Sequence, residues 1–309
     1  MTAVQDAPAA EPEQLAPPPR KPRRVRRPRP GYQVFGTVLT LLGVLLIGFV
    51  ADLAVVGSLR HARDQRTAYA HLRSELANAT APVSQTDVNG ALLRPGTPVA
   101  LLEIPQLGIR EVVLEGTSSG VLRSGPGHRR DTPMPGQQGT SVIFGRRAAF
   151  GGPFTDLPRL APGDMFRVTT GQGTAVYRVT DLRLAGDPQP PVLAGGAGRL
   201  TLVTAAGRRY LPEGTLRVDA DLVSTPQPLG AVKFGSGSLP AAEKSLATEP
   251  SAWVPVVLWG EALLLAALAL TWARSRWGRW QTWVAAVPVL GWLGVAAAGE
   301  IARLLPNLL

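Results

Sequence analysis

Three long apolar runs constrain this chain more than any other feature. They occupy residues 31–57, 251–273 and 282–305, and each reaches the roughly 20 residues that a helix needs to cross a bilayer. The first run is longer than the apolar region of a cleaved signal peptide, which is usually about 7 to 15 residues. The sequence therefore predicts three transmembrane helices, the first of them an uncleaved anchor.

Basic residues beside the apolar runs predict the orientation. Residues 1–30 are rich in proline, alanine and glutamate and end in an arginine-rich cluster, a composition that favours a disordered tail. Further arginines lie in the short loop 274–281. Because arginine and lysine are enriched on the cytoplasmic side of membrane proteins, we expect the tail and this loop in the cytoplasm. The region between the first two helices is then extracytoplasmic, in a multi-pass protein of the plasma membrane.

Each expected membrane helix carries one carboxylate, namely Asp52, Glu261 and Glu300. Acids inside a membrane are costly and usually functional, so these residues are candidates to contact one another or a basic partner. Glu261 is the best placed, about 12 Å from the start of its helix at a rise of about 1.5 Å per residue. Asp52 and Glu300 lie near helix ends, where water reaches them.

The composition excludes several kinds of chemistry. The chain has no cysteine, which removes disulfides, thiolate nucleophiles and cysteine metal ligands. The histidines, His61, His71 and His128, are too scattered for a metal cluster, so neither a metal nor another cofactor is expected. The net charge of +10 is concentrated beside the apolar runs rather than on one face of a domain, which argues against nucleic-acid binding.

Between the first two apolar runs, residues 98–223 show short apolar segments separated by glycine and proline turns. This pattern is typical of a mainly β fold, either a closed barrel or a sandwich. Residues 58–97 predict a solvated juxtamembrane helix and a linker, and residues 224–250 a second polar linker. The expected strands cover residues 99–104, 109–115, 140–145, 165–170, 175–184, 200–205 and 215–222.

The β domain also carries an ordered series of motifs. In order along the chain, they are Leu102-Glu-Ile-Pro-Gln-Leu-Gly-Ile109, Val113-Leu-Glu-Gly-Thr117, Gly125-Pro-Gly-His128, Pro135-Gly-Gln-Gln-Gly139, Val142-Ile-Phe-Gly-Arg-Arg147, Gly152-Pro-Phe154, Leu160-Ala-Pro-Gly-Asp164 and Leu200-Thr-Leu-Val-Thr204. Together they resemble the sortases, most like the class E type of actinobacteria. The resemblance implies a closed sortase β-barrel outside the membrane, and kinship with enzymes that join sorting-signal proteins to the cell wall or into pili.

The resemblance further implies a catalytic set of cysteine, histidine and arginine, which attack the substrate carbonyl, transfer a proton and steady the oxyanion. The family-equivalent positions here hold Ala205, Arg146 and Thr215. A methyl group cannot attack, and arginine stays protonated. Arg217 follows Thr215 by two residues and so shares its strand face. The sequence therefore predicts that no part of this catalytic set is intact.

These replacements predict a sortase-like pseudoenzyme that binds or scaffolds in cell-surface or cell-envelope assembly. Its groove, near Arg146, Arg147, Arg217 and His128, either holds a peptide or acidic cell-wall group or is a relic without a ligand. The expected partners are the membrane and a sorting-signal protein, a pilin or an active sortase. Two alternatives stay open: a divergent sortase with unconventional residues or a partner-supplied nucleophile, and a structural subunit whose helices matter more than its barrel.

Overall fold

The computed structural model describes residue 43 and residues 46–87, 89–235, 237–277 and 279–309. Every element described below lies in the compact unit Val44–Leu309. The expected tail 1–30 lies outside the described residues, and so does most of the first expected membrane helix.

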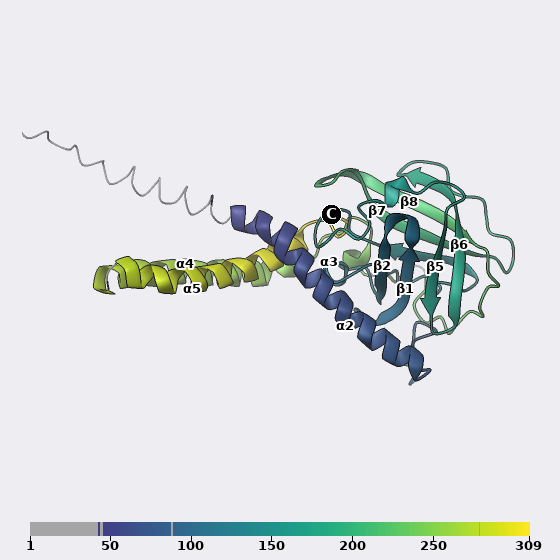
Figure 1. The fold of residues 1–309 in the computed structure, drawn as a ribbon, viewed down its shortest axis with the longest axis horizontal. Helices are drawn as coiled ribbons and strands as arrows, with labels where there is room; N and C mark the ends of the chain where they lie inside the picture. Colours follow the sequence, from purple (N-terminus) through teal and green to yellow (C-terminus); the bar gives the residue numbers. More distant parts are fainter. Residues whose placement is uncertain (1–42, 44–45, 88, 236, 278) are drawn as a thin grey trace, which may run out of the picture. The chain divides into compact units, whose positions relative to one another are not determined.

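Eight strands in the described part of the chain close into a barrel (Figure 1). Around the barrel they follow the order β1-β2-β3-β4-β7-β8-β6-β5. The strands are β1 (Pro98–Ile104), β2 (Ile109–Glu115), β3 (Gly127–His128), β4 (Gly139–Phe144), β5 (Met165–Thr170), β6 (Gly173–Leu184), β7 (Gly198–Arg208) and β8 (Leu211–Leu222). The expected mainly β closed barrel is confirmed. The sequence pattern missed β3, because so short a strand shows no alternation.

The interior of the barrel fixes which side chains of β7 face outward. Leu200 and Leu202 belong to the apolar cluster that fills the barrel. Successive residues of a strand point to opposite faces, so Thr201 and Val203 lie on the outer face, where they line a cavity. Strand β7 pairs in parallel with β4 and antiparallel with β8. The outer face of these three strands carries the candidate site.

One face of α2 (Gly57–Ala77) is buried against β2, whereas the sequence predicted a solvated helix. Leu72 is 1% exposed and packs with Val112 and Leu114. The Gln65 amide nitrogen donates to the Val112 carbonyl at 3.1 Å, and the Gln65 oxygen accepts from the Val112 amide at 2.7 Å. The buried face includes hydrogen-bonding side chains as well as apolar ones, and this mixture weakens the helical apolar pattern.

The two segments expected as linkers contact each other and the barrel domain. Gln85 is buried; its side chain donates to the Arg130 carbonyl and accepts from the amides of Lys233 and Phe234. Arg130 also forms an ion pair with Glu243 at 3.3 Å. The segment before the barrel and the segment after it are thus hydrogen-bonded to each other, and both contact Arg130 of the barrel domain.

The remaining helices of the described chain are mostly short. They are η1 (Asp52–Val56), η2 (Pro105–Leu107), α3 (Ser119–Leu122), η3 (Leu157–Arg159), η4 (Ala241–Glu243), η5 (Pro250–Ala252), α4 (Trp253–Trp277), α5 (Arg279–Ile301) and η6 (Ala302–Leu304). The long pair α4 and α5 extends through most of the expected loop 274–281.

Helices α4 and α5 pack side by side (Figure 1), with the rings of Trp259 and Trp292 edge to face at 5.4 Å. In the described chain, two helices are long and apolar enough to cross a membrane, over Pro250–Leu270 and Trp280–Leu304. Apolar side chains along them, such as Leu264 at 62% exposed, form a surface suited to lipid. Two of the three expected membrane helices are therefore supported.

Candidate functional site

The three positions that the sequence resemblance matches to the catalytic set lie near one end of β7. Ala205 lies opposite Thr215 in the register of β7 and β8. Strand β4 lies beside β7 with Phe144 opposite Val203, and Arg146 follows Phe144 by two residues. The barrel therefore brings Arg146, Ala205 and Thr215 to the same end of neighbouring strands.

Ala205 is enclosed by apolar side chains. It is 1% exposed and shares a cluster with Phe144 and Leu308. The neighbouring hydroxyl, on Thr204, is fully buried and donates to the Gly145 carbonyl at 2.8 Å. The two residues at this end of β7 thus present no nucleophile on the outer face.

Arg146 is fully buried, and its guanidinium group is bound by its neighbours. Nη2 donates to the Ser119 hydroxyl at 2.7 Å and carbonyl at 3.0 Å, and Nη1 to the Leu309 carbonyl at 3.5 Å. The guanidinium carbon also lies 5.0 Å from the centroid of the Phe150 ring, a cation–π contact. Burial, followed by the charge of Arg123, lowers the pKa of Arg146 to about 9. It therefore stays cationic at neutral pH and offers no base.

His128 is fully buried in a separate ion pair. Its Nδ1 lies 2.8 Å from the Glu115 carboxylate and its Nε2 lies 2.9 Å from the Pro133 carbonyl. Both nitrogens face acceptors, as suits a doubly protonated imidazolium. Burial alone would lower the pKa of His128, but the charge of Glu115 and the two hydrogen bonds outweigh it and raise the pKa above its ordinary value. This histidine holds β2 to β3.

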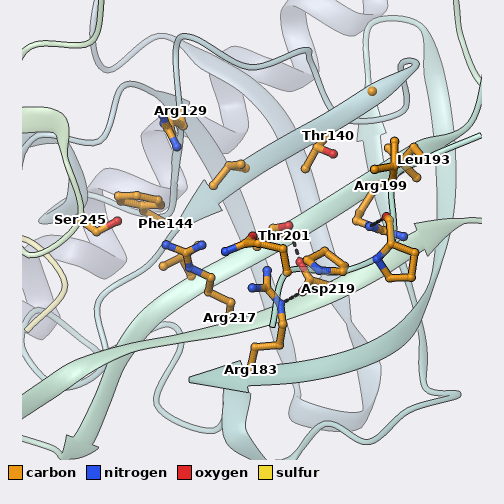
Figure 2. A pocket seen from close by; sticks show the side chains of 17 residues that line it. Arg129, Thr140, Phe144, Arg183, Leu193, Arg199, Thr201, Arg217, Asp219 and Ser245 are labelled. Atoms are coloured by element: carbon orange, nitrogen blue, oxygen red, sulfur yellow. Dashed lines mark hydrogen bonds and ion pairs between the residues drawn. The ribbon is translucent and has the colours of Figure 1, made fainter. Parts of the chain in front are cut away.

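A cavity of about 420 Å³ lies on the outer face of β4, β7 and β8 (Figure 2). This volume falls within the range of about 300–1,000 Å³ that is usual for ligand pockets. Its lining combines cationic and apolar side chains. They include Arg129, Arg183, Arg199, Arg217, Phe144, Val203 and Leu193. We call this cavity the groove.

Three of the four arginines in the groove are paired with aspartates. The pairs are Arg129 with Asp131, Arg183 with Asp219 and Arg199 with Asp221. Asp219 is fully buried and also accepts from the Thr201 hydroxyl at 2.6 Å. The backbone of Arg217 is part of the sheet, but among the described residues its guanidinium group forms no ion pair and no hydrogen bond. Its guanidinium is therefore available to an anionic ligand.

Of the four groove residues expected from the sequence, Arg217 lines the groove. Arg146 and His128 are buried outside it, and Arg147 donates from Nη1 to the Ala205 carbonyl at 2.8 Å. The structure thus separates a residue that faces the groove from three that support the end of β7 or the barrel beside it.

Sequence reasoning missed Arg183 and Arg199 as groove residues. Alternation along β7 places Arg199 on the same outward face as Thr201 and Val203, which was a usable signal. Arg183 lies on β6 and reaches Asp219 of β8, a contact that becomes evident only when the strand order is known.

Two of the three helix carboxylates lie close to arginines. Asp52 is buried, with Oδ1 3.8 Å from Nη1 of Arg60. Glu300 accepts from Nη1 of Arg303 at 2.8 Å. Glu261 is exposed on α4. The structure therefore gives Asp52 and Glu300 basic neighbours within the chain and leaves Glu261 at the helix surface.

Comparison with known proteins identifies the barrel. A family model described as a sortase domain matches residues 102–218, which extend from β1 into β8. The barrel thus matches a sortase domain. The ordered motifs seen in the sequence are the ones that this match covers.

Two sortases of other bacteria are similar to this chain. Sortase SrtE1 of Streptomyces coelicolor is 28% identical over 172 residues, which are 52% of this chain and 47% of that protein. Sortase D of Bacillus subtilis is 30% identical over 98 residues, which are 31% of this chain and 48% of that protein. The chain thus spans about half the length of these relatives. The expected class E resemblance is confirmed.

Solved sortase structures are similar as well. A sortase D5 transpeptidase of Clostridium perfringens is 21% identical with a TM-score of 0.44, covering 52% of this chain and 99% of that chain. Sortase E1 of Streptomyces coelicolor, solved with a tripeptide in its active site, is 25% identical with a TM-score of 0.38, covering 42% and 90%.

Proposed function

We propose that this protein is a membrane-anchored, extracytoplasmic member of the sortase family that binds a partner segment without cleaving it. It acts as a binding or scaffolding component in cell-surface protein or cell-envelope assembly. The observation that carries the proposal is Ala205, a buried methyl group where the family places its thiol, in a chain without cysteine.

The rest of the site supports this proposal. Covalent acyl transfer requires a nucleophile with a base in hydrogen-bond reach. Arg146, at the base position, is cationic and engaged by Ser119, and Thr204 points into the barrel toward the Gly145 carbonyl. The nucleophile and the base are therefore both replaced, and neither Arg146 nor Thr204 can supply either group.

The groove suggests the class of ligand. Arg217 is an unpartnered cation among the described residues, and a guanidinium group binds carboxylates strongly through paired hydrogen bonds. Phe144 and Leu193 add apolar wall to the same cavity. We infer a peptide segment that combines a carboxylate with apolar side chains, presented by a sorting-signal protein or a pilin.

The helices supply the location in this proposal. Helices α4 and α5 hold the protein in the membrane, with the first apolar run as a third span. The arginines of the tail and of residues 274–281 keep those parts in the cytoplasm. The barrel is then outside the cell membrane, where exported partners reach it.

Catalysis is tested with the full chain in detergent and a fluorogenic sorting-signal peptide. We expect no cleavage above the rate without protein. Turnover by the full chain alone would instead establish a divergent sortase. Turnover that appears only after an active sortase is added in trans is expected under the binding proposal, provided that the added enzyme alone shows the same rate.

Binding is tested with two fluorescein-labelled peptides that differ by one glutamate in place of glutamine, measured by fluorescence polarisation. The glutamate peptide should bind about tenfold more tightly, since a hydrogen bond to a charged group contributes about 1.5–3 kcal/mol. Arg217→Gln should remove that difference. Arg66→Gln removes the same charge from an exposed position on α2 and should preserve it. Equal affinity of both peptides for the parent protein would refute the ligand class.

A further inference from the structure

A short segment that follows α5 occupies the place where the sortase nucleophile is expected. Residues 305–309 come directly after η6. Leu308 is fully buried and belongs to the same apolar cluster as Ala205, Phe144 and Val203. A side chain distant in sequence thus packs with the methyl group that replaces the thiol.

The backbone of this segment is hydrogen-bonded on both sides. The amide of Arg147 donates to the Leu308 carbonyl at 3.0 Å and that of Ala149 to the Leu309 carbonyl at 3.4 Å. On the opposite side, the amide of Asn307 donates to the Ala247 carbonyl at 2.9 Å. The segment therefore lies between the loop after β4 and the chain that leads into α4.

The Asn307 side chain adds a polar anchor. It is fully buried, and its Nδ2 donates to the carbonyls of Thr117 at 2.8 Å and Lys244 at 2.9 Å. Buried amide hydrogens are costly unless paired, so this orientation is specific. Leucine or alanine at this position would remove this donor from both carbonyls, although the Lys244 carbonyl also accepts from the Ala247 amide at 3.1 Å.

Arg146 contributes to the same binding site. It donates hydrogen bonds to both Ser119 and the Leu309 carbonyl. The residue at the expected histidine position thus helps to bind the segment. Nearby, Arg303 of η6 donates to the carboxylates of Glu249 and Glu300 at 2.8 Å each. These two ion pairs hold η6 in place, and residues 305–309 follow directly from it.

We propose that the pocket at the sortase catalytic positions is a socket for this chain's own residues 305–309, with Ala205 and Arg146 as receptor residues. The socket fastens α5 to the barrel and closes the catalytic end of β7 to outside peptides. The groove around Arg217 stays accessible beside it. The socket does not depend on which ligand the groove binds, so either idea can fail alone.

The test uses single cysteines, because the chain has none of its own. In the full chain in detergent, Ala205→Cys should react with a maleimide at least about a hundredfold more slowly than Val192→Cys, which lies at a position 98% exposed. Adding Leu308→Asp should release the segment, because a buried carboxylate without a partner is costly. Labelling of Ala205→Cys should then accelerate at least tenfold. Equal rates with and without Leu308→Asp would overturn the proposal.

Two controls separate release of the segment from unfolding. Ala100→Cys, inside the barrel and 0% exposed, should stay unreactive in the Leu308→Asp background; if it becomes reactive, the segment is part of the barrel core and the proposal is wrong. Leu229→Asp puts the same charge at a leucine that is 50% exposed and should leave Ala205→Cys protected. Without any change at position 205, hydrogen exchange at the amides of Arg147 and Ala149 should accelerate in Leu308→Asp alone.

Discussion

The outer face of β7 holds two adjoining regions with opposite properties. The socket around Ala205 is apolar and filled by the chain itself, whereas the groove around Arg217 is cationic and lined by paired arginines. Val203 belongs to both. At one end, the side chain of Ala205 packs against Leu308 of the same chain, while at the other end the cavity around Arg217 has the surface that we propose for a partner.

Rebuilding the catalytic set tests whether residues 305–309 obstruct the catalytic end of β7. The variant Arg146→His, Ala205→Cys and Thr215→Arg should cleave a fluorogenic sorting-signal peptide poorly, because residues 305–309 still cover the new thiol. Adding Leu308→Asp should raise turnover by about tenfold or more, which is about 1.4 kcal/mol in the barrier. The rebuilt variant with Leu229→Asp is the matched control. Equal turnover in both would mean that the segment does not obstruct the site.

Removal of Asp219 tests the wall of the groove. Asp219→Ala leaves Arg183 as a buried charge without its partner, a change that typically costs about 3–5 kcal/mol. Asp221→Ala removes a carboxylate that is 44% exposed in its pair with Arg199 and should cost about 1 kcal/mol or less. Urea unfolding followed by circular dichroism measures both. Similar losses for the two variants would show that burial does not distinguish these ion pairs.

Truncation of one leucine in each region compares their packing. Leu308→Ala empties a fully buried site and should reduce the free energy of unfolding by about 2–4 kcal/mol. Leu193→Ala trims a partly exposed wall of the groove and should cost about 1 kcal/mol or less. The same urea experiment decides the matter. If Leu308→Ala is as mild as Leu193→Ala, the socket contributes little to stability.

The sequence predicted the barrel well because β strands and the turns between them have recognisable local sequence patterns. Alternation and glycine–proline turns marked every strand except β3 to within a few residues. The positions of Arg146, Ala205 and Thr215 followed from the ordered motifs, and Thr204 does face the barrel interior as alternation requires.

The remaining features depend on contacts between distant parts of the chain. Nothing local links Leu308 to Ala205, or Asn307 to the carbonyls of Thr117 and Lys244. Polar residues of a buried helix face mimic a solvated one, as Gln65 does on α2. Such contacts are specified by complementarity in three dimensions, which a single sequence does not display.

The smallest predicted effect is the change of stability with pH, which should differ from the change of groove affinity with pH. Since its pKa is raised in the folded state, His128 contributes stability that is fully present below its unfolded pKa of about 6.5 and is lost as the pH rises through the folded value. His61, whose pKa the hydrogen bond and charge of Glu111 raise against burial, acts with the same sign. The free energy of unfolding should therefore fall as the pH rises above about 6.5.

Affinity of the groove for the glutamate peptide should stay constant over that range, because the buried His128–Glu115 pair lies outside the groove lining. In His128→Gln the decline of stability with pH should be shallower, whereas His71→Gln, at a side chain 58% exposed, should leave it unchanged. Parallel urea unfolding and polarisation titrations at several pH values measure the two quantities. A groove affinity that fell together with stability would show that the buried His128–Glu115 pair maintains the shape of the groove. Stability and peptide binding would then both depend on that pair.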